Sequence, residues 1–291
     1  IRTPMNGILA MASVLVDEEK DQGNPRRREI LETIFKSASS LLSLLNDVLD
    51  ISQIESGKME IRPAQFSVDQ LVLDCVSTFS QNAQNAGTVL HIGDKTGATF
   101  SGDPSRLKQM IGNLISNAIK FSPGGIVELT VAITGAGEEP RMLTVMVKDN
   151  GPGISAKQQQ KLFMPFSQIE EIRTHQHGSG LGLSIVRKLA EIMGGSVGVI
   201  SESGRGSTFH FTVRESKISP SDSKVQSDTE LGGTSVADIG SIQGKKVMVV
   251  DDTHSNLFVL EVLLKKLGAD VWTFDNAEEA LSLFEHGQTV D

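Results

Sequence analysis

The chain has 291 residues, a length that fits about two domains and a sizeable core. Its formal net charge is −9, and no basic stripe occurs beyond Arg26–Arg28, which argues against wrapping by nucleic acid. The single cysteine, Cys75, excludes a disulfide framework and fits a reducing compartment, so we expect a cytoplasmic location. The sequence contains no run of 18 apolar residues, so we predict no membrane-spanning segment in it. Any membrane anchor is expected upstream of Ile1.

Residues 1–60 are predicted to form a helical hairpin. Apolar residues recur at helical intervals over Ile1–Val16, and a polar break follows over 17–25. Over Leu31–Val48 they repeat with the 3,4 alternation of a heptad seam, and further leucines widen this stripe beyond what one partner helix covers. We therefore predict a homodimer through a four-helix bundle. The alternative is a hairpin that docks on its own domain.

A second domain is predicted over 61–214. An amphipathic helix is expected at Phe66–Phe79, and another begins after Asp103, a good N-cap that precedes a proline suited to the first helical position. This second helix runs to Phe121. At about 100° per residue, five polar side chains share one of its faces. They are Arg106, Gln109, Asn113, Asn117 and Lys120.

Two asparagines one turn apart, Asn113 and Asn117, set this polar face apart from an ordinary solvated one. Asparagine is a poor helix former, so the pair suggests amide oxygens for a cation. The flanking Arg106 and Lys120 suggest positive charge for phosphates. The alternative is an ordinary amphipathic helix whose polar face meets water.

Alternating apolar residues predict the strands of this domain. Val127–Ile133 and Met142–Lys148 form an expected hairpin around a turn at Gly135–Pro140. The remaining strands are expected at Val197–Ile200 and Thr208–Val213.

Asp149 continues the parity of the inward residues of its strand, so its carboxylate should face the interior. A buried carboxylate needs hydrogen bonds, and an exocyclic amine such as adenine N6 is a suitable donor. Gly151 and Gly153 then let the backbone approach a flat ring. A second glycine run, Gly178–Gly182, leads into a helix whose N-terminus suits phosphate oxygens.

Four motifs resemble the N, G1, F and G2 boxes of sensor histidine kinases, in the family's order and spacing. They are Asn113-Leu-Ile-Ser-Asn117-Ala-Ile-Lys-Phe121, Asp149-Asn-Gly-Pro-Gly153, Lys161-Leu-Phe-Met-Pro-Phe166 and Gly178-Ser-Gly-Leu-Gly-Leu183. The resemblance implies a Bergerat-type (GHKL) α/β sandwich that binds ATP and Mg²⁺, with a lid at Ser167–Gly178.

Carried over residue by residue, the resemblance assigns adenine N6 to Asp149, Mg²⁺ to Asn117 and phosphate to Lys120. Asn113 stands where related ATPases have a glutamate that activates water, and a neutral amide there suits transfer to a protein nucleophile. A further glycine box before Thr208 implies a phosphate contact. The expected cofactor-binding set is Asn117, Lys120, Asp149, Gly151, Gly153, Phe163, Gly178, Gly180, Leu181, Gly182 and Thr208.

The opening residues Ile1–Gly7 resemble the end of the family's H box. The resemblance places the phosphoaccepting histidine just upstream of Ile1, so the chain as it stands is expected to bind ATP without phosphorylating itself.

Residues 215–243 lack aromatic residues and a sustained period, and predict a flexible linker. Residues 244–291 then predict a βαβα run that resembles the first part of a flavodoxin-like receiver domain. Asp251 and Asp252 end its first strand, where doubly wound sheets bind ligands, and would share Mg²⁺. The phosphoaccepting aspartate is expected beyond Asp291.

The resulting fold class is α+β multidomain, and the implied function is a phosphorelay from ATP to a histidine and then to a receiver aspartate. Expected partners are a second copy, the receiver in cis and a downstream phosphotransfer protein or response regulator. Two alternatives stay open. A gyrase- or Hsp90-like ATPase is disfavoured by Asn113, and a non-catalytic dimerisation scaffold would show no Mg²⁺-dependent ATP binding.

Overall fold

The computed structural model describes residues 25–135, 140–167, 180–216, 242–252 and 254–285, with the isolated residues Ile8, Ala12 and Leu15. The chain divides into two compact units, of which one spans Asp47–Val225 and the other combines Ile1–Asn46 with Gln226–Asp291. The predicted first helix, the turn after it and most of the predicted lid lie outside the described residues. In the part that the structure describes, no helix has the length and apolar character needed to cross a membrane.

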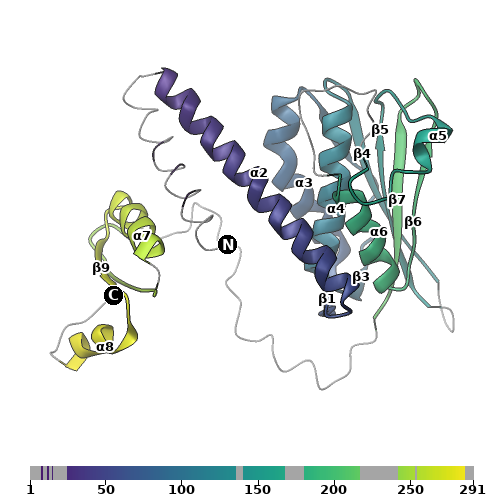
Figure 1. Cartoon of the computed structure of the whole chain (residues 1–291). Coiled ribbons are helices and arrows are strands. Elements are labelled where there is room, and N and C mark those ends of the chain that lie inside the picture. Colours follow the sequence, from purple (N-terminus) through teal and green to yellow (C-terminus); the bar gives the residue numbers. More distant parts are fainter. Residues whose placement is uncertain are drawn as a thin grey trace. The chain divides into compact units, whose positions relative to one another are not determined.

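The larger unit is built on a five-stranded sheet with the strand order β2-β4-β5-β7-β6 (Figure 1). All neighbouring strands are antiparallel except β2 and β4, which are parallel. The predicted hairpin is confirmed, because Val131 of β4 pairs with Val145 of β5. The strands are β2 (Val89–Ile92), β4 (Ile126–Thr134), β5 (Met142–Asp149), β6 (Val197–Ser201) and β7 (Ser207–Arg214).

Three helices pack against one face of this sheet, and the core lies between them and the strands (Figure 1). Burial of the apolar stripe of each helix against the inward side chains of β4, β5 and β7 is the main source of stability. Fully buried side chains include Leu107, Ile111, Leu143, Leu189 and Phe211. The helices are α3 (Val68–Asn85), α4 (Pro104–Phe121) and α6 (Gly182–Ile192).

The start of this unit differs from the prediction. The helix expected at Phe66–Phe79 begins at Val68, because Ser67 caps it by accepting a hydrogen bond from the Gln70 N–H, and Phe66 belongs to a strand. That strand, β1 (Ala64–Ser67), pairs with β3 (Thr99–Gly102) as a separate antiparallel ribbon. The prediction missed β1, β2 and β3, since four residues are too few to show a clear alternation.

The predicted second hairpin helix is present as α2 (Pro25–Glu55). Apolar side chains along it are exposed, among them Ile34, Leu41 and Val48. Near its C-terminal end, Ile51 and Ile54 pack instead against the core of the larger unit. The helix therefore presents an apolar stripe over most of its length and is anchored at its last turns.

Beyond the last strand, Glu215 and Ser216 still bond to the larger unit, although the sequence placed them in the linker. The Glu215 carboxylate accepts from Arg141 at 2.9 Å and from the Ser101 N–H at 3.2 Å, and the Ser216 N–H donates to the Ser101 carbonyl. The short helix α5 (Ala156–Gln159) completes the unit beside the site.

The C-terminal elements follow the predicted βαβα order. Strands β8 (Lys246–Val250) and β9 (Asp270–Phe274) pair in parallel, with Lys246 opposite Asp270 and Val250 opposite Phe274. Helices α7 (His254–Lys266) and α8 (Ala277–Glu285) follow the two strands. A parallel pair joined by a helix is the unit from which doubly wound sheets are made.

Candidate functional site

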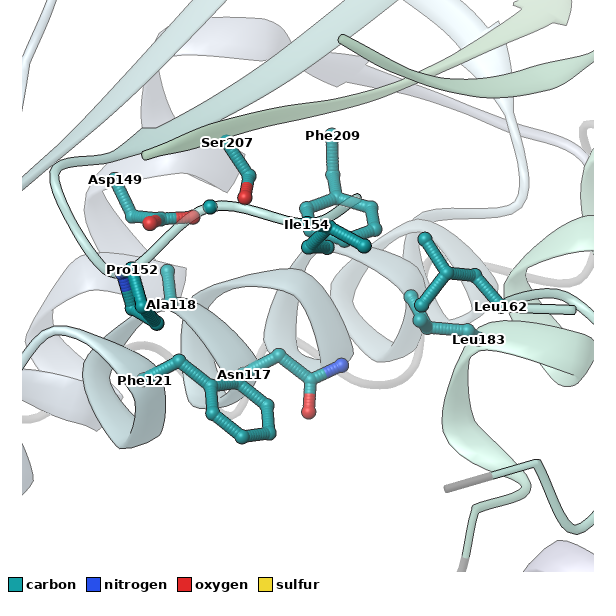
Figure 2. Close-up of a pocket in the computed structure, with 11 residues that line it drawn as sticks. Asn117, Ala118, Phe121, Asp149, Pro152, Ile154, Leu162, Leu183, Ser207 and Phe209 are labelled. Carbon is teal, nitrogen blue, oxygen red and sulfur yellow. The ribbon is translucent and has the colours of Figure 1, made fainter. Parts of the chain in front are cut away.

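A pocket lies between α4 and the ends of β5 and β7 (Figure 2). Its walls are mostly apolar, with Asn117 on the helix side and Asp149 and Ser207 on the strand side (Figure 2). The lining residues are Asn117, Ala118, Phe121, Asp149, Pro152, Gly153, Ile154, Leu162, Leu183, Ser207 and Phe209. This lining suits an apolar group that is recognised by polar atoms at one edge.

Asp149 is the last residue of β5 and is buried, as its parity predicted. Burial raises the pKa of its carboxyl, while hydrogen bonds from the backbone N–H groups of Gly151 and Ser207 oppose that change. The Gly151 N–H lies 2.8 Å from Oδ1. The carboxyl group is thus fixed in direction, and the hydroxyl of Ser207 lies close to it in Figure 2.

The glycines after Asp149 are required by the packing of the chain on itself. A Cβ on Gly151 would lie 2.6 Å from the Phe121 carbonyl oxygen. Gly153 has a φ of +69°, and a Cβ there would lie 2.0 Å from the carbonyl oxygen of Glu202. These contacts alone explain both glycines, so the backbone beside Asp149 is held in place without a ligand.

The polar face of α4 divides into two halves. Asn117 lines the pocket, and Asn113, one turn earlier, donates from Nδ2 to the Gly182 carbonyl at 3.4 Å. Lys120 is half-buried, its Nζ lies 5.1 Å from the centre of the Phe121 ring, and burial lowers its pKa. Of the five polar residues on this face, Asn117 alone lines the pocket, and Arg106 and Gln109 lie at the other end of the helix.

Arg106, predicted to offer positive charge to phosphates, instead contacts a carboxylate of another helix in the structure. Its Nη1 lies 3.2 Å from Oδ1 of Asp50 on α2 and 2.9 Å from Oε1 of Gln109. The Gln109 amide in turn donates to the other Asp50 oxygen at 2.7 Å. No sequence pattern indicated this partner, which stands 56 residues before Arg106.

The second glycine run brings the N-terminus of α6 to Asn113. Gly182 is the first helical residue, and the buried Leu181 before it accepts from the Ile185 N–H at 2.9 Å. Gly180 has a φ of +69°, and a Cβ there would lie 3.0 Å from the backbone carbonyl carbon of Phe166. Gly178 lies outside the described residues. The helix end, with N–H groups suited to anions, thus adjoins the asparagines.

Two family models match the chain. Residues 102–217 match "Histidine kinase-, DNA gyrase B-, and HSP90-like ATPase", and residues 1–57 match the "His Kinase A (phospho-acceptor) domain". Both matches agree with the expected helical region and ATP-binding sandwich. The chain belongs to the sensor histidine kinases.

Similar proteins agree with this membership. Autoinducer 2 sensor kinase/phosphatase LuxQ of Vibrio vulnificus (strain YJ016) is 33% identical over 98% of this chain and 33% of its own length. Virulence sensor protein BvgS of Bordetella bronchiseptica is 37% identical over 100% of this chain and 23% of its own. A crystal structure of full-length ShkA with AMPPNP has 26% identity and a TM-score of 0.60 over 97% of this chain and 55% of that one. The chain thus spans about a third of the length of LuxQ.

Two residues predicted to bind the nucleotide, Thr208 and Phe163, are not among the residues that line the pocket. Thr208 lies between Ser207 and Phe209 on β7, and successive side chains of a strand point to opposite faces. Because its two neighbours line the pocket, Thr208 points away, and Ser207 takes the position next to Asp149. Phe163 is not in the pocket lining, but its ring packs on Phe209 with the centroids 6.5 Å apart. It supports the pocket wall from behind.

Asp251 and Asp252 follow β8, as expected for the receiver-like part. The Asn256 amide donates to both carboxylate oxygens of Asp251, at 3.0 and 3.1 Å, and Asp252 is exposed. Among the described residues no group of three His, Cys, Asp or Glu side chains gathers as a metal site. The shared Mg²⁺ at this pair stays a prediction.

Proposed function

We propose that this histidine kinase core binds Mg²⁺-ATP in the pocket and passes the γ-phosphoryl group to a histidine of the hairpin, then to a receiver aspartate. The observation that carries the proposal is the fixed, buried Asp149 at one end of an apolar slot whose other side leads to Asn117. In this arrangement Asp149 would hydrogen-bond the edge of a flat ring. The polar phosphates of the same ligand would lie near the two asparagines of α4.

The adenine end comprises Asp149, Gly151, Gly153 and Ser207. An Asp149 oxygen that accepts from an exocyclic amine offsets the cost of its burial, because the donor replaces lost water. The apolar walls, Ile154 and Phe209 among them, would cover the ring faces. Recognition of adenine thus rests on one hydrogen-bonded edge and two apolar faces.

The phosphate end comprises Asn113, Asn117, Lys120 and the first turn of α6. Mg²⁺ takes few protein ligands when phosphate oxygens and water supply the rest, so the single amide of Asn117 fits the ion. When bound, Mg²⁺ neutralises phosphate charge. Lys120 and the α6 N-terminus would hold phosphate oxygens, and Asn113 is kept beside Gly182 by its hydrogen bond.

Among the residues that the structure describes, no carboxylate stands at the phosphate end to act as a base for water, which favours transfer over hydrolysis. Asp149 is the only carboxylate among the described residues that line the pocket, and it lies at the adenine end. Asn113 carries a neutral amide that cannot accept a proton from water at neutral pH. A nucleophile must therefore come from outside the pocket.

In the proposed transfer, an imidazole nitrogen attacks the γ-phosphorus in line and forms a P–N bond. The bond from the γ-phosphorus to the bridging oxygen breaks, and ADP leaves with that oxygen. An aspartate oxygen then attacks the same phosphorus and the P–N bond breaks. The exposed apolar stripe of α2 would pair with a second copy, which makes the homodimer part of this proposal.

Incubation of the full-length protein with γ-labelled ATP tests the proposal. We expect label in a form that is labile to acid and stable to base, as phosphohistidine is, with little free phosphate released. Asp149→Asn is the matched control, and it should lose the label at low ATP concentrations and regain it at high ones. Rapid release of phosphate without labelled protein would instead favour a gyrase-like ATPase.

A further inference from the structure

The last turns of α2 are attached to α4 by a closed set of three side chains, Asp50, Arg106 and Gln109. One Asp50 oxygen lies 3.2 Å from Arg106 and the other 2.7 Å from Gln109, which also accepts from Arg106 at 2.9 Å. The side chains of Asp50 and Arg106 are only 11% and 25% exposed. Both are thus removed from most of their water, and each depends on the other.

The attachment point lies on the helix that carries the phosphate end of the pocket. Gln109, Asn113 and Asn117 follow one another at intervals of one turn on the same face of α4. A rigid helix therefore couples the position of α2 to the position of the bound phosphates.

A groove beside this attachment separates the end of α2 from α6, the helix whose first turn belongs to the proposed phosphate end. It runs between the last turns of α2, at Ile51 and Ile54, and the first two turns of α6, at Ser184 and Arg187. Ile51 and Ile54 carry no nucleophile, and α2 contains no histidine along its 31 residues. In this docked arrangement α2 therefore presents no histidine to α6.

We propose that Asp50, Arg106 and Gln109 form a latch that holds the ATP-binding domain in a resting position at the C-terminal end of α2. Transfer to a histidine requires the γ-phosphorus within about 3–3.5 Å of the nitrogen, so the latch must open first. A buried ion pair suits a reversible contact, because its Coulombic gain is nearly balanced by the cost of removing both charges from water. The proposal rests on the proposed function.

The test compares Asp50→Ala with Asp74→Ala in the full-length protein. Asp74 also binds a basic residue of α4, Lys108 at 2.7 Å, but within the ATP-binding domain. We expect Asp50→Ala to raise the rate of histidine phosphorylation at saturating ATP by about tenfold, the factor for one lost charge-assisted hydrogen bond, with ATP affinity unchanged. Asp74→Ala should leave both unchanged. An unchanged or lower rate in Asp50→Ala would overturn the latch.

A second measurement is independent of activity. Spin labels at the exposed positions Gln53→Cys and Ser203→Cys report the distance between α2 and the domain, and Cys75 reacts slowly because burial raises its pKa to about 11. Diluting labelled chains with unlabelled ones removes distances between copies. Asp50→Ala should broaden the distribution of distances between the two labels. The double variant with Arg106→Ala should show the same distribution as Asp50→Ala alone, because both changes break the same contact. Unchanged distances would overturn the latch. If the distances change as expected but the protein does not bind ATP, only the proposed function is overturned.

Discussion

The adenine end of the pocket is fixed by contacts of the backbone with itself, whereas the phosphate end is made of side chains from two helices. At the first, Gly151 and Gly153 lie against carbonyl groups and Asp149 accepts from a backbone N–H. At the second, Asn117 of α4 and Leu183 of α6 both line the pocket, and the contact between Asn113 and Gly182 is long, at 3.4 Å. If ATP binds as proposed, recognition of the base needs no rearrangement of the backbone, while the side chains proposed to hold the phosphates can adapt to their ligand.

Gly153→Ala should cause the largest effect, because it breaks the fixed end. Its φ of +69° and a Cβ 2.0 Å from the Glu202 oxygen combine strain and overlap, which should lower the free energy of unfolding by about 2–5 kcal/mol. Gly204→Ala is the matched control, since its φ of +82° is similar but a Cβ there meets nothing within 4 Å. Urea unfolding of both variants separates overlap from strain. Equal losses would show that the close contact at Gly153 contributes nothing.

Asn117→Asp tests the adaptable end. A carboxylate in place of the amide should change the Mg²⁺ concentration at half-maximal ATP binding by about tenfold, since charge count sets the affinity of oxygen ligands for hard cations. Binding of adenosine, which has no phosphates, should not change. Calorimetric titrations with ATP and adenosine at several Mg²⁺ concentrations measure both. An altered affinity for adenosine with an unaltered Mg²⁺ midpoint would place the metal on another residue.

The smallest effect concerns the cost of Asp149 in the unliganded protein. Burial raises the pKa of its carboxyl, so the folded state binds a proton more tightly than the unfolded state does. Its contribution to stability is therefore full below the unfolded value, near 4, and is lost as the pH rises through the folded pKa. Asp149→Asn should unfold at a slightly higher temperature than the wild type at pH 7 and at the same temperature near pH 3. If Asp149→Asn is less stable than the wild type at pH 7, burial of the charged Asp149 carboxylate does not cost stability.

The periodicity of single strands and helices predicted which side chains of the candidate site share a face. Asp149 followed from the alternation of β5, and Asn113 and Asn117 from the face of α4, which Asp103 caps as expected. These inferences needed only the period of one element. The resemblance then supplied their roles, which stay predictions.

Pairing between distant segments was not visible in the sequence. Ser207 meets Asp149 because the two are paired across β5 and β7, and no sequence pattern singled out Ser207, whose neighbour Thr208 was predicted to contact phosphate. Arg106 is neutralised by Asp50, a residue from a different helix. A carboxylate at that position looks like any polar residue near a helix end until both helices are placed.

The central claim is that Asp149 recognises the amine of adenine. A cycle with ATP and purine riboside triphosphate, which lacks that amine, measured by calorimetry on the wild type and on Asp149→Asn, tests it most directly. We predict that the wild type prefers ATP by about 1.5–3 kcal/mol, the range for a charge-assisted hydrogen bond, and that the variant loses this preference. An equal preference for ATP in both proteins would contradict the account.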